Sequence, residues 1–297
     1  MYTIYKIGGG ILKIIALSKV NLGLDVIRKR EDGYHDVRMI MQTLELCDEL
    51  CIERRADDEI HILCNDDSLE CDENNLIYKA AVAIMNSAGI RAGLDIRLIK
   101  NIPIAAGMAG GSSDAAATLK GVNELLQLGM SIERLKEIGV TIGADVPYCV
   151  EGGTQLSEGI GEKLTRLKPV PPCFVVVAKP HIGVSTRYVY ENLHVETIDR
   201  HPDIDALIKG IDDSDIDEIA LHMENILENV TEKKYPIIAM LKKALLECGA
   251  LNALMSGSGP TVFALFKDRS AAEAALDKVM RTGEVAFGCV TQFANNL

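Results

Sequence analysis

The sequence contains no tryptophan, and aromatic residues make up only 4% of its 297 residues. No apolar run reaches the roughly 18 residues that a membrane-spanning helix needs, and the basic start lacks the apolar core and cleavage site of a signal peptide. Basic residues are also few, since 31 Lys and Arg face 43 Asp and Glu, a net charge of -12. We therefore expect a cytoplasmic protein that binds neither a membrane nor a nucleic-acid backbone, which needs a basic face.

Several familiar motifs are missing as well. The eight cysteines form no C-x-x-C pair and no zinc spacing, so we expect reduced thiols, mostly inside apolar runs. The histidines other than His35 form no group with metal-ligand spacing. There is no Walker A loop, no G-x-G-x-x-G dinucleotide fingerprint, and no H-R-D or D-F-G of a protein kinase.

The sequence does contain a glycine-rich loop that leads into a helix. Apolar residues recur at helical spacing after Ser112, and Ser112, Ser113 and Asp114 are residue types that favour the N-cap. The free N–H groups of the first turn and the positive end of the helix dipole would face the loop. Because Gly107 and Gly110 lack a Cβ, the backbone can approach a ligand closely. The pattern predicts a phosphate site, and the alternative is an ordinary turn that caps a helix.

This loop, PIAAGMAGGSSDAAA, resembles the phosphate loop of the small-metabolite kinases of the galactokinase, homoserine, mevalonate and phosphomevalonate (GHMP) family. Further segments resemble that family in the same order: SKVNL at 18–22 with GYH at 33–35, GADVP at 143–147, and SGSGP at 256–260. The resemblance runs from about Ile14 to Phe266, with serine at 18 and methionine at 108 where alanine and leucine are usual. Residues 1–13, which include three consecutive glycines, precede it, and we treat them as a leader with an uncertain start site.

The resemblance implies an α+β fold of two lobes, with an N-terminal ATP-binding lobe over residues 1–168 and a C-terminal ferredoxin-like lobe over 173–297. It also implies an ATP- and Mg²⁺-dependent kinase with its active site in the cleft between the lobes, as a monomer or weak homodimer. The nearest member acts on a small molecule, a methylerythritol that carries cytidine diphosphate, in isoprenoid synthesis. Two alternatives stay open: a kinase of homoserine, mevalonate or a sugar, and a non-catalytic sensor of nucleotide or metabolite.

The resemblance assigns Lys19 and Asp145 to the catalytic centre. Because a carboxylate beside an ammonium group stays ionised and fixed in direction, Asp145 could accept the proton of the attacking hydroxyl, or only orient it. Lys19 would offset charge as the phosphoryl group moves. Taken one at a time, Asp145 could instead be a helix cap and Lys19 a strand residue that extends along the surface.

The resemblance also assigns the binding residues. Tyr34 would stack on cytosine and His35 would read its edge, with Asn21 near the erythritol and Thr186 and Tyr190 closing over the acceptor; otherwise Tyr34 closes a hairpin. A hydroxyl would help to hold magnesium, and we assign that role to Ser113. The expected ATP-binding residues are Asn75, Lys100, Pro103, Ile104, Ala105, Ala106, Gly107, Met108, Ala109, Gly110, Gly111, Ser112 and Ser113. Otherwise Asn75 is a helix cap and Lys100 a surface charge.

Hydrophobic periodicity and turn residues predict the secondary structure. The expected strands span residues 11–16, 22–27, 37–46, 60–64, 94–98, 173–178, 251–255, 262–266 and 285–290. The expected helices span residues 75–88, a segment after 112, 131–138, 185–192, 204–209, 216–227, 236–247 and 270–280. Prolines at 169, 171 and 172 predict a stiff connector between the two lobes.

Overall fold

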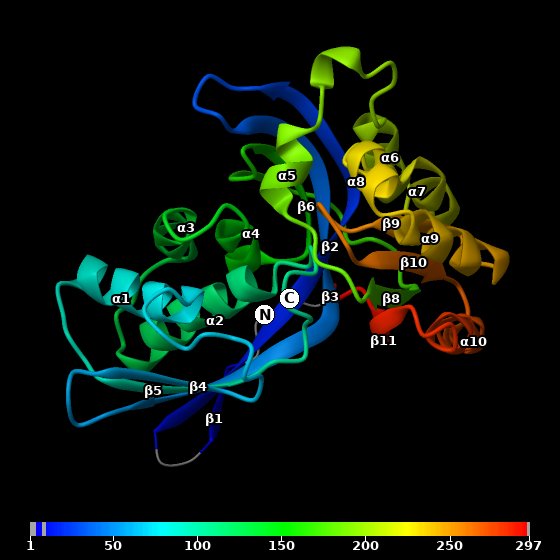
Figure 1. The fold of residues 1–297 in the computed structure, drawn as a ribbon. Coiled ribbons are helices and arrows are strands. Elements are labelled where there is room, and N and C mark those ends of the chain that lie inside the picture. Colours follow the sequence, from blue (N-terminus) through cyan, green and yellow to red (C-terminus); the bar gives the residue numbers. More distant parts are fainter. Residues whose placement is uncertain (1–3, 8–9, 296–297) are drawn as a thin grey trace.

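Two long antiparallel strands run through the molecule in the computed structural model, which describes residues 4–7 and 10–295 (Figure 1). Strand β2 (Ile11–Lys29) pairs with β3 (His35–Arg54) along almost its whole length. The sequence predicted two short strands where β2 is continuous, because register shifts along the pair absorb the irregular residues between them. The prediction for β3 ended too early, since the polar residues after Leu46 remain paired with β2 and with β5.

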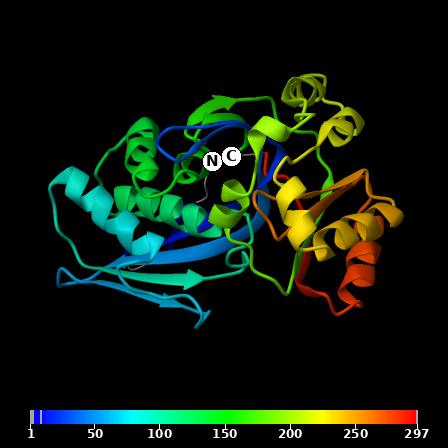
Figure 2. The same cartoon turned by 45° about the horizontal axis from the view of Figure 1, so that its top comes forward.

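These strands form the centre of a seven-stranded sheet in the order β1-β2-β3-β5-β4, with β6 paired to β3 and β7 to β6. The other strands are β1 (Ile4–Ile7), β4 (Ile60–Cys64), β5 (Leu94–Ile99), β6 (Thr154–Gly159) and β7 (Lys163–Arg166). The helices α1 (Leu76–Ala88), α2 (Gly110–Leu125), α3 (Ile132–Val140) and α4 (Val146–Glu151) lie together on one face of this sheet (Figure 2). Helix α2 packs directly on β2 and β3.

The second sheet has four antiparallel strands in the order β11-β8-β10-β9. They are β8 (Phe174–Pro180), β9 (Asn252–Met255), β10 (Val262–Phe266) and β11 (Val285–Gln292). The helices are α5 (Thr186–Glu191), α6 (Ile204–Asp212), α7 (Ile216–His222), α8 (Glu228–Lys234), α9 (Ile237–Glu247) and α10 (Arg269–Met280), with a 3₁₀ turn at Val195–Thr197. With α9 and α10 packed on the sheet, the arrangement is the ferredoxin-like β-α-β-β-α-β pattern. The predicted α+β class with two lobes is confirmed.

The two lobes share a hydrophobic core at the place where the long strands meet the second sheet. Val20, Leu22 and Leu44 of β2 and β3 are fully buried in one cluster with Val177 of β8 and Phe263 of β10. The predicted connector over residues 169–172 separates the two sheets, but the buried cluster crosses it.

One predicted helix needs correction, and several elements were not predicted. The helix predicted over 216–227 ends at His222, because Met223 is extended and Asn225 pairs with Leu24 of β2. Short elements with weak periodicity, β1, β6, β7, α4 and α8, were not predicted. The strand β1 falls inside the segment that we treated as a leader, whereas Gly8 and Gly9 lie outside the described residues.

Two further observations concern the composition. None of the helices in residues 4–7 and 10–295 combines the length and the apolar character that a membrane span needs. The eight cysteines are free, and two of them, Cys149 and Cys173, are buried while the other six are half-buried.

Candidate active site

The glycine-rich loop ends in helix α2, which starts earlier than the sequence predicted. The helix begins at Gly110, after Ala109 in the left-handed conformation with φ 55°, and no side chain caps it. The expected N-cap role of Ser112, Ser113 and Asp114 is therefore wrong, since these residues lie within the helix. The left-handed backbone before the helix directs the chain so that the first N–H groups stay open to the loop.

At position 107 of this loop, no residue with a Cβ fits without a shift of the backbone. Its φ is 74°, and a Cβ there would lie 2.2 Å from the backbone oxygen of Ser256 in the second lobe. Gly110, in contrast, is not in the left-handed region, and a Cβ there would meet the ammonium group of Lys100 at 2.9 Å. The backbone of the loop therefore lies directly against the second lobe at Gly107.

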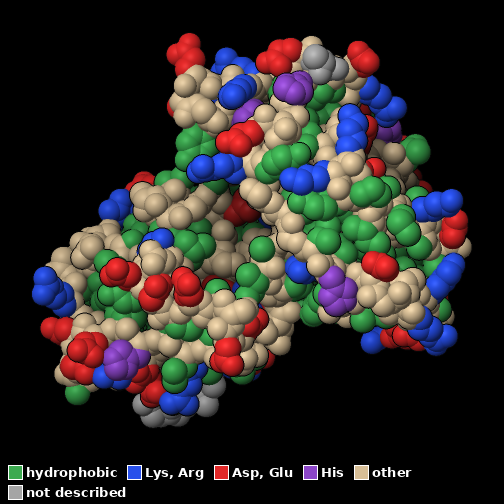
Figure 3. All heavy atoms as spheres, in the orientation of Figure 1, with side chains coloured by type: hydrophobic (Ala, Val, Ile, Leu, Met, Phe, Trp, Pro, Cys, Tyr) green, Lys and Arg blue, Asp and Glu red, His purple; other side chains and the backbone are tan. Residues whose placement is uncertain are grey.

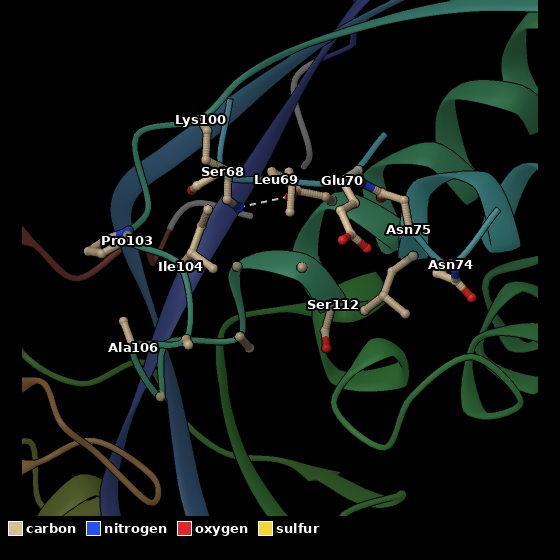
Figure 4. Close-up of a pocket in the computed structure, with 17 residues that line it drawn as sticks. Ser68, Leu69, Glu70, Asn74, Asn75, Lys100, Pro103, Ile104, Ala106 and Ser112 are labelled. Carbon is tan, nitrogen blue, oxygen red and sulfur yellow. Dashed lines mark hydrogen bonds and ion pairs between the residues drawn. The ribbon is translucent and has the colours of Figure 1, made fainter. Parts of the chain in front are cut away.

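A cavity of about 580 Å³ opens beside the loop and the start of α2. Figure 4 shows Glu70, Asn74 and Asn75 on one side of it and Pro103, Ile104 and Ala106 on the other. The remaining lining residues are Ser68, Leu69, Leu76, Lys100, Ala105, Gly107, Ala109, Gly110, Gly111, Ser112 and Asp114. Most expected ATP-binding residues therefore surround one space, and Met108 and Ser113 do not line it.

Asn75 and Lys100 occupy this wall for different structural reasons. Asn75 caps α1, because its Oδ1 accepts from the N–H of Ile77 at 2.9 Å, and it lines the first cavity as well. Lys100 is no surface charge: its ammonium group donates to Asp48 at 2.5 Å and to Asp114 at 2.8 Å, and its side chain is 5% exposed.

The charges of this cluster are set by burial and by close partners. Burial alone lowers the pKa of Lys100, but the carboxylates of Asp114 and Asp48 hold it above its ordinary value. Burial raises the pKa of the Asp114 carboxyl to about 7, against the opposing charge of Lys100. The ammonium group thus stays charged at the edge of the first cavity and connects the end of β5 to α2.

A second cavity of about 440 Å³ lies across the loop, in the hollow between the lobes (Figure 3). Three residues, Gly107, Ala109 and Ser112, line both cavities. All of the residues expected to be catalytic or to bind the acceptor line this second one: Lys19, Asn21, Tyr34, His35, Asp145, Thr186 and Tyr190. A phosphate held in the first cavity would therefore meet a group held in the second one at the shared wall.

Lys19 and Asp145 form a loose ion pair at this shared wall. The ammonium group of Lys19 lies 3.7 Å from a carboxylate oxygen of Asp145 and donates to Asn21 Oδ1 at 2.8 Å and to the Gly107 oxygen at 3.3 Å. Asp145 occupies the N-cap position of α4, but its side chain makes no capping hydrogen bond to the helix. The register shift of β2 next to Lys19 is the kind of bulge that redirects a side chain toward a site.

The second cavity is lined by an exposed tyrosine and a buried histidine. Tyr34 is 60% exposed at the tip of the β2-β3 hairpin, and its ring is free to receive a flat partner. The buried His35 ring packs at 5.1 Å from the Tyr190 ring, and burial, assisted by Lys29, lowers the pKa of His35 against the effect of Glu196. The hydroxyl of Thr186 lies 2.8 Å from that of Ser258.

The structure changes the assignment of the metal-binding hydroxyl. The Ser113 hydroxyl is buried and donates to the Leu17 oxygen at 2.6 Å, so it faces neither cavity. The expectation that the Ser113 hydroxyl helps to hold magnesium is therefore corrected. Ser112 lines both cavities and Ser113 lines neither, because successive side chains of an α-helix point about 100° apart. Sequence reasoning also missed Ser68, Leu69 and Glu70, which carry no motif and reach the first cavity only through the fold.

Comparison with known proteins points to one family. Residues 75–153 match the model described as GHMP kinases N terminal domain, and residues 205–285 match the one described as GHMP kinases C terminal. A 4-diphosphocytidyl-2-C-methyl-D-erythritol kinase from Lachnoclostridium phytofermentans is 52% identical and covers 89% of this chain and 91% of its own length. One from Clostridium perfringens is 51% identical over 90% of this chain and 92% of its own length.

Solved structures agree on the fold. A crystal structure of 4-(cytidine 5'-diphospho)-2C-methyl-D-erythritol kinase has a TM-score of 0.81 at 28% identity and covers 96% of this chain and 100% of its own. The crystal structure of L. major mevalonate kinase in complex with R-mevalonate has a TM-score of 0.76 at 16% identity and covers 100% of this chain and 99% of its own. The second likeness shows the fold alone.

Proposed function

This chain belongs to the GHMP kinase family, and we propose that it transfers the γ-phosphoryl group of ATP to the 2-hydroxyl of 4-diphosphocytidyl-2-C-methyl-D-erythritol, in the non-mevalonate (MEP) route to isoprenoid precursors. One observation carries the proposal: two cavities meet at the phosphate loop, and the Lys19–Asp145 pair stands on the acceptor side of their shared wall. Relatives at about half identity that bear this enzyme's name support the same acceptor.

The chain's own residues provide binding and charge for the phosphates. The open N–H groups at the start of α2 and the positive end of its dipole face the loop, where Gly107 allows close approach. Bound Mg²⁺ would neutralise phosphate charge. Residues 4–7 and 10–295 hold no group of three His, Cys, Asp or Glu suited to a metal, which fits an ion held mostly by nucleotide phosphates and water. Ser112 is the hydroxyl in position to contribute.

Asp145 and Lys19 act on the acceptor hydroxyl in this proposal. Asp145, a third exposed, orients the hydroxyl and can accept its proton as the oxygen attacks phosphorus. Lys19 holds Asp145 and the Gly107 carbonyl together, so the hydroxyl and the loop stay in register.

The acceptor would lie along the second cavity from Lys19 to Tyr34. Cytosine would stack on the exposed Tyr34 ring and contact His35, while Asn21 would face the erythritol end. Thr186 and Tyr190 would close over the acceptor. We further propose a cytoplasmic enzyme that is a monomer or weak homodimer.

Coupled ADP release over a panel of acceptors tests the proposal. We expect turnover with the cytidyl acceptor, and far less with bare methylerythritol, mevalonate or homoserine, because binding energy from the base places the reacting hydroxyl. A preference for mevalonate or homoserine would contradict the proposed acceptor but not the proposal that the protein is a kinase. Tight ATP binding without ADP release from any acceptor would instead favour a sensor.

Tyr34 offers a sharper test of base recognition. Tyr34→Ala should weaken acceptor binding by about 1–3 kcal/mol, the usual value of a base-aromatic stack, and leave the KM for ATP unchanged. Tyr5→Ala is a matched control, because Tyr5 is also about half exposed but lies on β1, away from both cavities. An unchanged acceptor constant in Tyr34→Ala would remove the stacking role.

A further inference from the structure

The turn between β9 and β10 forms part of the acceptor wall although it belongs to the second lobe. Gly257 and Ser258 of this turn line the acceptor cavity. The Ser256 hydroxyl donates to the Gly107 oxygen at 2.9 Å, and that oxygen also accepts from Lys19. The position of the turn therefore affects both the acceptor and the phosphate loop.

One buried side chain, Asn225, binds the backbone of this turn from outside the cavity. Its Nδ2 donates to the backbone oxygens of Met255 and Gly257, both at 2.8 Å, while its Oδ1 accepts from the N–H of Leu227 at 3.0 Å. The residue is 3% exposed. Both N–H groups of the amide and its oxygen are thus used, and such bonds are strong where water cannot compete.

The segment that carries Asn225 is itself anchored to the long strand β2. The N–H of Leu24 donates to the Glu224 oxygen at 2.9 Å, and the N–H of Ile226 donates to the Leu24 oxygen at 3.0 Å. Glu228 adds a second hold, because its Oε1 accepts from the N–H of Met255 at 2.7 Å. Asn225 thus connects β2, which also carries Lys19, to the turn on the opposite side of the cavity.

We propose that Asn225 is a positioning residue for phosphoryl transfer: it fixes the turn over residues 256–261 against the acceptor cavity and, through Ser256, fixes Gly107. It lines neither cavity and acts only through the turn. The effect of Asn225 on phosphoryl transfer rests on the proposed function, whereas its hold on the turn does not. Gly257 and Ser258 line the acceptor cavity directly, whereas the turn reaches the nucleotide cavity only through the contact of Ser256 with Gly107. Displacement of the turn should therefore harm the acceptor step more than ATP binding.

Asn225→Asp tests this role at nearly constant shape. The variant removes the amide donors and turns a carboxylate oxygen toward two carbonyl oxygens, which pushes the turn away. We expect kcat to fall at least about ten-fold and the acceptor KM to rise, since small misplacements of a reacting group cost that much or more. The KM for ATP should change by less than about three-fold.

Asn252→Asp is the matched control. Asn252 has the same bonding pattern in the same lobe, donating to the oxygens of Ala220 and Met223 at 2.6 and 3.3 Å and accepting from the N–H of Ala253 at 2.8 Å, but it does not touch the turn. If Asn252→Asp lowers kcat as much as Asn225→Asp at equal stability, general damage to the lobe explains the effect and the proposal is wrong. Should Asn225→Asp fail to fold, Asn225→Ser removes the amide without adding charge and should show the same split between the acceptor and ATP constants.

Hydrogen–deuterium exchange separates this inference from the proposed function. Amides of residues 255–259 should exchange faster in the Asn225 variants than in wild type and Asn252→Asp, whether or not the acceptor is turned over. A wild type that phosphorylates no acceptor would contradict the proposed function alone. Unchanged exchange in this turn would overturn the positioning role even in an active enzyme.

Discussion

At the scale of single residues, the site depends on a few groups that hold one another. Lys19 contacts Asp145, Asn21 and the Gly107 oxygen at once, so one buried ammonium group joins the Asp145 carboxylate to the glycine-rich loop. In the reaction that we propose, this charge would stabilise the transition state because it is already in place when the phosphoryl group moves.

Asp145→Asn tests the catalytic pair. The amide keeps the shape but cannot accept a proton, and we expect kcat to fall by about 10² or more while ATP binding and folding stay near wild type. Asp95→Asn on β5, away from both cavities, is the control. Near-normal turnover by a folded Asp145→Asn protein would remove this carboxylate from the mechanism.

The burial of His35 predicts that the folded protein loses stability as the pH falls. Burial lowers its pKa in the folded protein, whereas in the unfolded chain a histidine titrates near about 6.5. As the pH falls through that value, the unfolded state takes up a proton first, so the free energy of unfolding should decrease.

Urea unfolding at several pH values measures this effect. Between about pH 7 and 6, His35→Asn should lose less stability than wild type, because it lacks the proton-binding difference. Equal pH dependence of His35→Asn and wild type would contradict the role of burial at this site.

At the scale of elements, helix α2 begins without a side-chain cap, which suits the phosphate-binding role that we propose for the glycine-rich loop. Ala109 in the left-handed region ends the loop, and no serine or aspartate side chain occupies the first N–H groups of the helix. A capping side chain would compete with a phosphate for those groups, which is why the absent cap suits anion binding.

Gly107→Ala should damage this element strongly. The added Cβ would need a left-handed backbone and would overlap the Ser256 oxygen, so we expect a loss of more than about 1 kcal/mol in unfolding free energy and weaker ATP binding. Gly111→Ala is the stability control, since its Cβ would meet only Leu76 at an ordinary 3.4 Å. Denaturant unfolding and calorimetric ATP titration measure both. Equal stability of the two variants would show that the loop can move away from the second lobe.

At the scale of the whole molecule, the long strands serve both lobes. Near its middle, β3 pairs with β2 and β6, and there the Thr43 oxygen accepts from the N–H of Ala294 at 2.9 Å. The cavity between the lobes therefore rests on one continuous pair of strands, whose bulges and turns bring Lys19 and Tyr34 to the same space.

The shared core predicts that the lobes do not fold apart. A fragment of residues 1–168 would expose Val20, Leu22, Ile40 and Leu44, which the second lobe buries, so we expect it to aggregate or unfold. Circular dichroism and size-exclusion chromatography measure this, and co-expression with residues 173–297 should restore a soluble complex. A stable, monomeric 1–168 fragment would show that the lobes are independent domains.

The sequence by itself determined the features whose causes lie within a few residues. Ser131 and Asn75 cap helices as their types predict, β10 has the predicted bounds, and the glycine-rich loop does lead into a helix beside a cavity. Hydrophobic period, turn chemistry and capping act locally, so they can be read along the chain. The family resemblance, confirmed by the comparisons, rested on such local motifs.

Only the tertiary structure decided which distant groups meet. Lys100 is buried because Asp48, 52 residues away, approaches it, and Gly107 is indispensable because Ser256 lies against it from the other lobe. The choice between Ser112 and Ser113, and the hold of Asn225 on the turn, follow from the exact rotation of a helix and from packing between lobes. Contacts of this kind depend on how whole elements pack, and no local pattern of residue types encodes them.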